Sequence, residues 1–110
     1  MNAESKNSFL NLFPLFSVLS DDEKSRLSDM MEHRVKSRYS FIYLPDDASD
    51  EIYFLARGTV KIGTHSSDGK EVIKSLIHPT AMFGELGLIG ETNRQDFAQA
   101  LKEDVHLYVL

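Results

Sequence analysis

The sequence predicts a mainly β domain, a sandwich or barrel of short strands that follows a helical N-terminal part. Strand-like runs recur about every ten residues from residue 34 to the end of the chain, and polar turns separate them. One of these turns, Ser66-Ser67-Asp68-Gly69, is a clear hairpin signal. The helical pattern lies in residues 1–33, so we expect 1–33 to form a helical lead and 34–110 to form the β-structure.

The clearest helix start in the chain is Ser20-Asp21-Asp22-Glu23. Serine is a favoured N-cap, acidic residues suit the first turn, and Glu23 occupies the capping-box position. We expect this helix to end by about His33. The apolar side chains on one face of it are Leu27, Met30 and Met31.

The apolar run at residues 9–16 predicts a second, packed amphipathic helix. It differs from a signal peptide because Asn11 and Pro14 interrupt it, and acidic residues rather than a small-residue cleavage site follow it. No stretch of the sequence approaches the ~20 apolar residues of a membrane span. These features predict a cytoplasmic protein without membrane contact.

The strands are predicted where the apolar period changes to two. Alternation with charged residues begins at Val35 and continues to Tyr39. Polar or glycine-containing turns bound the later runs, and His78-Pro79-Thr80 ends one of them. These later runs are 41–44, 52–56, 59–64, 71–77, 97–101 and 105–110.

The stretch Met82–Gly90, with Arg94 beyond it, is the candidate functional site. A short helical turn beginning near Gly84 points unpaired N–H groups outward, which favours an anion. Arg94 supplies a forked cationic donor for phosphate oxygens, and Glu85 can accept a hydrogen bond from a hydroxyl on the same ligand. These residues predict a pocket for a small anion that also carries a hydroxyl. The glycines that let the backbone turn and approach a ligand closely are Gly84, Gly87 and Gly90.

The run Phe83-Gly84-Glu85-Leu86-Gly87-Leu88, with Arg94, resembles the phosphate-binding cassette of cyclic nucleotide-binding domains. It is similar in particular to the catabolite activator protein (CRP/FNR) family of transcription regulators. Segment 52–62 and the hairpin Asp68-Gly69-Lys70-Glu71 resemble two further motifs of that family, so the resemblance covers about residues 12–110. It implies a double-stranded β-helix, a jelly-roll-like β-roll, with N-terminal helices and a one-turn helix in the phosphate-binding cassette.

The resemblance implies a role for each residue of the cassette. The backbone N–H groups of Gly84, Glu85 and Leu86 hold the cyclic phosphate together with Arg94, and the Glu85 carboxylate accepts the ribose hydroxyl. Gln95 stands where the family has Ser or Thr, and its amide N–H can replace their hydroxyl as a donor to the phosphate. The implied effector is cAMP or cGMP, with no tightly bound cofactor.

Gln95 and Asp96 depart from the family pattern, which has Ser or Thr and then Ala after the arginine. Losing one charge-assisted hydrogen bond costs roughly 1.5–3 kcal/mol, about one to two decades in affinity. Asp96 also places a like charge beside the expected phosphate. In a strand the two side chains face opposite ways, which predicts that only one of them lines the pocket. The departure leaves a second function open: a roll that has lost its ligand and serves as a dimerisation or docking module.

The composition excludes several other classes of protein. The chain has 110 residues, 42% of them apolar, enough for one small domain with its own core. It carries 12 basic and 17 acidic residues, and the resulting charge of −5 argues against direct binding of nucleic acid. The absence of cysteine excludes disulfides, cysteine-ligated zinc and thiolate catalysis and, within the resembled family, an iron–sulfur sensor.

The four histidines lack the spacing of a metal site, because a cupin-type site needs a His-x-His pair with further convergent ligands. His78 precedes the cassette and could ligate haem, as in a carbon monoxide-sensing branch of the family, but it stands alone. The sequence has no Gly-x-Ser-x-Gly or P-loop motif. We interpret Glu85 and Arg94 as an ion pair used in binding. We therefore expect no metal site and no enzymatic activity.

The chain ends at the last predicted strand, 105–110, whereas members of the resembled family continue into a dimerisation helix and a DNA-binding helix-turn-helix. We expect residues 1–110 to be the effector domain of a longer, homodimeric regulator that contacts DNA through a missing C-terminal domain. The leading hypothesis is a ligand-sensing domain for a small anionic effector. The regulatory domain of a channel, transporter or kinase is a third alternative.

Overall fold

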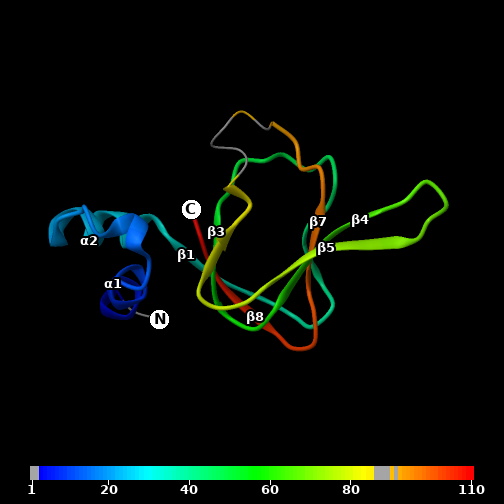
Figure 1. Cartoon of the computed structure of the whole chain (residues 1–110). Helices are drawn as coiled ribbons and strands as arrows, with labels where there is room; N and C mark the ends of the chain where they lie inside the picture. The colour runs from blue at the N-terminus through cyan, green and yellow to red at the C-terminus, as the bar shows by residue number, and fades with distance from the viewer. Residues whose placement is uncertain (1–2, 86–89, 91) are drawn as a thin grey trace.

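The computed structural model describes residues 3–85, 90 and 92–110 and confirms a mainly β fold (Figure 1). Three short helical segments come first: α1 (Ala3–Leu10), the 3-10 helix η1 (Pro14–Phe16) and α2 (Asp21–Met30). The strands that follow are β1 (Glu32–Lys36), β2 (Phe41–Tyr43), β3 (Tyr53–Arg57), β4 (Val60–His65), β5 (Glu71–Ile77), β6 (Ala81–Phe83), β7 (Phe97–Ala100) and β8 (Val105–Val109).

The strands form two antiparallel sheets of four strands each. The first sheet has the order β1-β8-β3-β6, and the second has the order β2-β7-β4-β5. Strands that are neighbours in a sheet are mostly distant in the sequence, because the chain crosses repeatedly between the sheets. This is the jelly-roll arrangement that the sequence predicts. Among the strands of the described residues, only β4 and β5 are consecutive neighbours, and their hairpin projects away from the body of the domain (Figure 1).

The main core lies between the two sheets. Tyr53 and Leu55 of β3 belong to it, whereas Phe54 between them points to the opposite face of the first sheet. β3 is therefore buried on both faces, which explains why its first three residues, 53–55, are continuously apolar. The second sheet contributes Ile42, Tyr43, Val60, Ile62, Ala98 and Ala100 to the same core.

The helical lead covers the outer face of the first sheet (Figure 1). The ring of Phe54 lies 5.3 Å from Phe13 and 5.6 Å from Phe16, measured between ring centroids. Phe9 packs in the same way on Tyr108 of β8, at 4.8 Å. This aromatic cluster attaches residues 3–31 to the strands that also carry part of the functional site.

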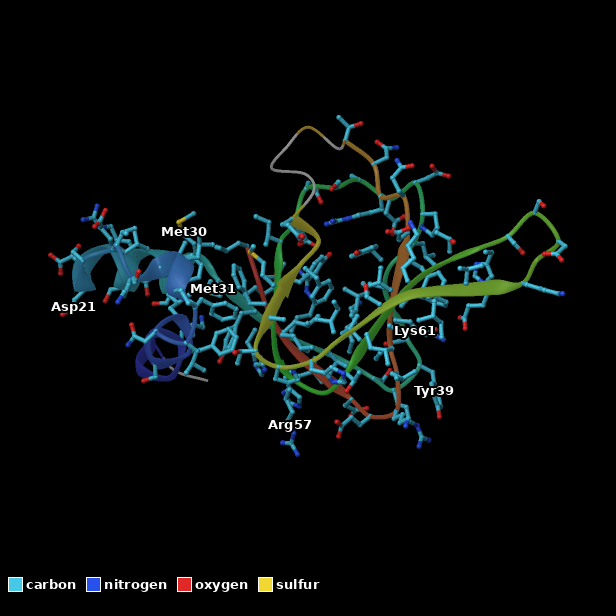
Figure 2. The ribbon with its side chains drawn as sticks, viewed as in Figure 1. Asp21, Met30, Met31, Tyr39, Arg57 and Lys61 are labelled. Carbon is cyan, nitrogen blue, oxygen red and sulfur yellow. The ribbon has the colours of Figure 1, made fainter. Side chains whose placement is uncertain are left out.

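The start of α2 confirms the predicted capping box. The Glu23 backbone N–H donates to Ser20 Oγ (3.2 Å), and the Ser20 N–H donates to Glu23 Oε1 (2.9 Å). The helix ends at Met30, within the expected limit of about His33, because Met31 has an extended backbone (φ −81°, ψ 133°). Met31 consequently turns into the core, while Met30 points to solvent (Figure 2).

The prediction of one amphipathic helix over residues 9–16 is wrong. α1 ends at Leu10, and a separate 3-10 turn forms at Pro14–Phe16. Proline has no backbone N–H and cannot continue a helix, and the intervening turn is closed by bonds from Leu12 N–H to Phe9 O and from Phe13 N–H to Leu10 O. The aromatic side chains of the run are nevertheless buried, as expected of a packed segment.

β6 is a strand that the sequence did not predict. Its three residues are too few to show an alternating pattern, and the strand exists because Ala81–Phe83 pair with Tyr53–Leu55 of β3. The one-turn helix predicted just after Gly84 falls mainly on 86–89, outside the described residues.

Candidate functional site

A cavity of about 190 Å³ lies at one end of the roll, between β6 and the segment that leads into β7. Its apolar wall comes from the core, with Ile62, Ile77 and Phe83 among the lining residues. Of the five predicted site residues, four line the cavity: Gly84, Glu85, Arg94 and Gln95. The fifth, Leu86, lies outside the described residues.

Arg94 is the most constrained of these side chains. It is only 5% exposed, and its guanidinium donates from Nη1 to Gly84 O (2.8 Å) and from Nη2 to Glu51 O (2.6 Å). The guanidinium carbon also lies 4.3 Å from the ring centroid of Tyr43 and 5.6 Å from that of Tyr53. Two backbone carbonyls and two aromatic rings therefore fix the guanidinium at the cavity wall.

Gly84 makes this arrangement possible. Its φ of +75° is rarely adopted by residues with a side chain, and a Cβ there would lie 2.9 Å from both Arg94 Nη1 and Tyr53 Cδ2. Glycine thus allows the backbone to approach the arginine and to accept its hydrogen bond. The sequence predicts a close approach at Gly84, but of the backbone to a ligand; the structure shows it with Arg94.

The expected ion pair between Glu85 and Arg94 is absent. Among the described residues, no carboxylate oxygen lies within 4.0 Å of the Arg94 guanidinium. Nε of Arg94 is also buried, and it has no hydrogen-bond partner among the residues that the structure describes. A buried cation without a counter-ion is costly, so the site is electrostatically prepared for an anion.

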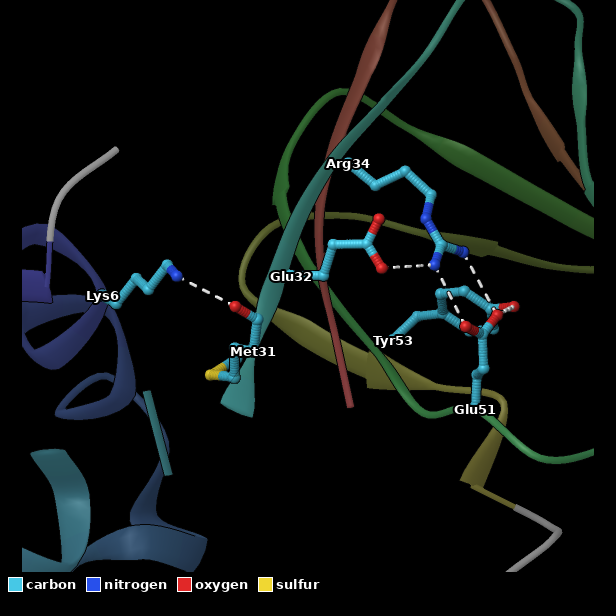
Figure 3. A network of polar contacts seen from close by, with 6 residues as sticks. All are labelled: Lys6, Met31, Glu32, Arg34, Glu51 and Tyr53. Carbon is cyan, nitrogen blue, oxygen red and sulfur yellow. Dashed lines mark hydrogen bonds and ion pairs between the residues drawn. The ribbon is translucent and has the colours of Figure 1, made fainter. Parts of the chain in front are cut away.

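The carboxylate of Glu51 is near enough to affect Arg94 but is engaged elsewhere (Figure 3). It accepts from both terminal nitrogens of Arg34, at 3.1 and 3.0 Å, and from the Tyr53 hydroxyl at 2.9 Å. The hydrogen bonding to Arg34 has the largest effect and that to Tyr53 a smaller one, and both hold the pKa of Glu51 below its usual range. Glu32 also accepts from Arg34 (2.9 Å), and the two carboxylates raise the pKa of that guanidinium.

Gln95 and Asp96 both line the cavity, so the prediction that only one would do so is wrong. They lie in a bend before β7 rather than in a strand, and strand alternation does not apply to them. Gln95 is exposed, and its amide donates to Asn93 O (3.3 Å). Asp96 lies 2.9 Å from the ammonium of Lys74 in β5, measured from Oδ1 to Nζ.

The charged residues of the site affect the pKa of Tyr43. Burial, together with the nearby carboxylates of Asp96 and Glu85, raises the pKa of its hydroxyl to about 12, although Arg94 acts in the opposite direction. Sequence reasoning missed Tyr43, Glu51 and Lys74, because nothing in their local sequence marks them. Their placement beside Arg94 or Asp96 depends on strand pairing.

The histidines do not gather into a metal site in the described part of the chain, where no group of three potential ligands is found. His78 is exposed. His33 and His106 are neighbours on β1 and β8, with His33 Nε2 3.4 Å from His106 Nδ1. Within the described residues, none of the helices is long and apolar enough to cross a membrane.

Comparison with known proteins places these residues in a family context. The family model of the cyclic nucleotide-binding domain matches residues 34–110. The cyclic AMP receptor protein of Thermus thermophilus is 29% identical over 97 residues, which covers 88% of this chain and 44% of that protein. A cAMP-dependent protein kinase regulatory subunit of Mycosarcoma maydis is 30% identical over 86 residues, which covers 78% of this chain and 16% of that protein. The chain thus spans less than half the length of these relatives.

A solved structure supports the same grouping. The N-terminal domain of a transcriptional regulator from Streptomyces coelicolor A3(2) matches with a TM-score of 0.81 and 30% sequence identity. The match covers 93% of this chain and 72% of that chain. These similar proteins are named as regulators or receptors rather than as enzymes.

Proposed function

Because this chain belongs to the cyclic nucleotide-binding domain family, we propose that it is the ligand-sensing domain of a CRP/FNR-type transcription regulator. Its ligand, by this proposal, is a cyclic nucleotide such as cAMP, held in the cavity beside Arg94. The observation that carries the proposal is the buried guanidinium of Arg94, which has no carboxylate partner among the described residues. A cyclic phosphodiester supplies the one negative charge that this cation lacks.

The geometry is consistent with different residues of the cavity binding different groups of the ligand. Arg94 uses two of its five N–H donors on backbone carbonyls and retains others, including Nε–H, for phosphate oxygens. Glu85 lines the same cavity and is free to accept a ribose hydroxyl, because it forms no ion pair with Arg94. We assign the remaining phosphate donors to the backbone N–H groups of Gly84, Glu85 and Leu86 and to the amide of Gln95.

Sensing requires that the ligand bind one arrangement of the protein more tightly than another, since only differential affinity shifts a conformational equilibrium. Arg94 connects the cavity, through Glu51 O, to the segment just before β3, and β3 carries Phe54, on which the helical lead packs. This path joins the ligand to the outer face of the first sheet. Dimerisation and DNA contact, by the same proposal, belong to a part of the protein beyond these 110 residues, because the net charge of −5 disfavours DNA.

Calorimetric titration with cAMP and with cGMP tests the proposal. We expect saturable binding by the wild type, weakened at least about 100-fold by Arg94→Met and about 10-fold by Glu85→Gln, since charge-assisted hydrogen bonds contribute about 1.5–3 kcal/mol each. Arg57→Met is the matched control, because Arg57 is exposed at the end of β3 (Figure 2). Absence of heat at millimolar nucleotide, or equal heats for the wild type and Arg94→Met, contradicts the proposal.

A roll without ligand that serves as a dimerisation or docking module is the second candidate. The bond from the Gln95 amide to Asn93 O favours it, because this amide is then occupied within the protein. The cavity of about 190 Å³ is also below the ~300–1,000 Å³ of ordinary ligand pockets. Failure of every nucleotide to bind, combined with a concentration-dependent dimer in sedimentation experiments, supports this candidate instead.

The similarity to a protein kinase regulatory subunit favours a further variant of the proposal. In that variant the same cavity binds the same class of ligand, but the domain regulates an enzyme, channel or transporter rather than a DNA-binding part. Ligand titration does not separate the two, whereas the sequence encoded after Leu110 does.

A further inference from the structure

A β-bulge in β5 lies next to the cavity. Ser75 pairs with Ile62 of β4, but the next pair is Ile73 with Gly63, so Lys74 has no partner opposite it. An extra residue of this kind bends the strand and re-aims its side chain, and bulges are common beside functional sites. The bulge therefore lies at the residue whose side chain reaches Asp96.

The contact between these two residues brings a cation to the cavity wall. Lys74 Nζ lies 2.9 Å from Asp96 Oδ1. The Asp96 side chain is 18% exposed and lines the cavity. Lys74 is 53% exposed and does not line the cavity itself, but it contacts the cavity wall through Asp96, a position that we call the rim. Asp96 is thus the less exposed partner, and the more exposed Lys74 compensates its negative charge.

A charge count shows what this pair does for the site. The described charged side chains at the cavity and its rim are Arg94 and Lys74 on one side and Glu85 and Asp96 on the other. Their formal charges sum to zero, and without Lys74 they sum to −1. An uncompensated Asp96 would repel any phosphate bound at Arg94, two residues earlier in the chain.

We propose that Lys74 and Asp96 form a specificity pair, in which Lys74 neutralises Asp96 so that the cavity accepts an anion with one negative charge. The proposal rests on the proposed function of the same cavity and names the charge class of its ligand. A phosphodiester brings one negative charge, which Arg94 balances. A phosphomonoester brings about −1.5 to −2 at pH 7, and its second charge meets Asp96 and Glu85 without a free cation. The pair therefore favours a cyclic nucleotide over its linear 5′-monophosphate.

The pair also explains why the sequence can depart from the family pattern at Asp96. Asp96 is tolerated at this position because Lys74 reaches it across the second sheet. The pair differs from a structural salt bridge in one measurable respect. A partly exposed ion pair contributes about 0–1 kcal/mol to folding, so its removal should change ligand affinity much more than stability.

The test is a charge-swap series titrated with cAMP and with AMP. We expect Lys74→Gln to weaken cAMP binding about 10-fold at ~0.02 M ionic strength and less at ~0.15 M, because salt screens the exposed charge. The double variant Lys74→Gln with Asp96→Asn should return to within about 3-fold of the wild type. Asp96→Asn alone should bind AMP at least about 5-fold better, because the cavity then has one excess positive charge.

The matched control is Lys70→Gln, which removes the same charge from the β4–β5 turn, where Lys70 is 83% exposed. The proposal is overturned if Lys74→Gln binds cAMP as Lys70→Gln does, or if the double variant is as weak as Lys74→Gln. Both results leave the proposed function intact, because the wild type still binds cAMP in each of them. Failure of the wild type and of every variant overturns the proposed function and this pair with it.

Discussion

Arg34 and Arg94 both donate to Glu51, but they bind different atoms of it. Arg34 forms a bidentate pair with the carboxylate and a second pair with Glu32, on the surface of the first sheet (Figure 3). Arg94 binds only the backbone carbonyl of Glu51 and is almost completely buried. One arginine is thus neutralised by the protein, and the other is fixed in place with its charge unmatched.

By our proposal, this difference separates an arginine that serves the fold from one that serves a ligand. A carboxylate partner satisfies a cation within the fold, and such a pair near solvent contributes about 0–1 kcal/mol. A buried cation held only by carbonyls and aromatic rings pays for its desolvation without a counter-charge, and it is retained where a ligand completes it. Four predictions test whether the two arginines differ in this way.

The largest effect is expected from Gly84→Ala. The new Cβ meets Arg94 Nη1 and Tyr53 Cδ2 at 2.9 Å, so the guanidinium must leave its carbonyl partners. We expect the free energy of unfolding to fall by about 3 kcal/mol and ligand binding to be lost. Gly69→Ala is the control, since its φ of +85° causes the same backbone strain with no atom within 4 Å. Its expected cost is about 1 kcal/mol. Equal losses in urea denaturation for the two variants would show that Arg94 has not moved.

The second prediction concerns stabilisation by ligand. At a nucleotide concentration 100 times its Kd, the wild type should gain about 2.7 kcal/mol in unfolding free energy, by mass action alone. Arg34→Met should keep this gain, because Arg34 is satisfied within the protein, whereas Arg94→Met should lose it. Thermal unfolding with and without cAMP measures both. A gain retained by Arg94→Met would remove the distinction between the two arginines.

The third prediction is a pH dependence at Arg34. Arg34 lowers the pKa of Glu51, so this carboxylate contributes stability above its ordinary pKa of about 4.5 and loses it as the pH falls through the lower folded value. The contribution is under about 1 kcal/mol, because Glu51 is about one-third exposed. We expect Glu51→Gln to flatten the acid limb of the stability curve more than Glu32→Gln, whose carboxylate is 65% exposed. Identical limbs for these two variants would argue against the bidentate pair.

The smallest effect is expected on the pH dependence of stability at His33, which lies near His106 and Lys6. Burial, and then the neighbouring His106 and Lys6, lowers the pKa of His33. The folded state therefore binds fewer protons than the unfolded state, and stability falls as the pH drops below about 6.5. His33→Gln should reduce this loss, as measured by denaturation between pH 7.5 and 5.5 (about one unit either side of the ordinary pKa). His78→Gln, at an exposed histidine, should not change the slope.

Features that depend on residues close in the sequence were predicted well. The capping box of α2 joins residues three positions apart, and the β4–β5 hairpin turns at the predicted polar tetrapeptide. Four of the five predicted site residues line one cavity, because they belong to two short segments on either side of it. The role of each in binding stays a prediction.

Features that depend on pairing between distant strands were not predicted. β6 is a strand only because β3 lies beside it, and Lys74 reaches Asp96 only because β5 bulges against β4. The prediction that Gln95 and Asp96 face opposite ways failed for the same reason, since it assumed a strand that begins only at Phe97. A one-residue difference in register or strand boundary changes which side chains meet.

The sequence by itself therefore determined the fold class and the two segments that line the cavity, with Arg94 in one of them. Alternation, turn chemistry and capping act over a few residues, so they can be recognised without a structure. Only the tertiary structure decided that Arg94 has no carboxylate partner among the described residues while Arg34 has two. The partners of an arginine are decided where strands from distant parts of the chain meet. By our proposal, these partners distinguish an arginine that serves the fold from one that serves a ligand.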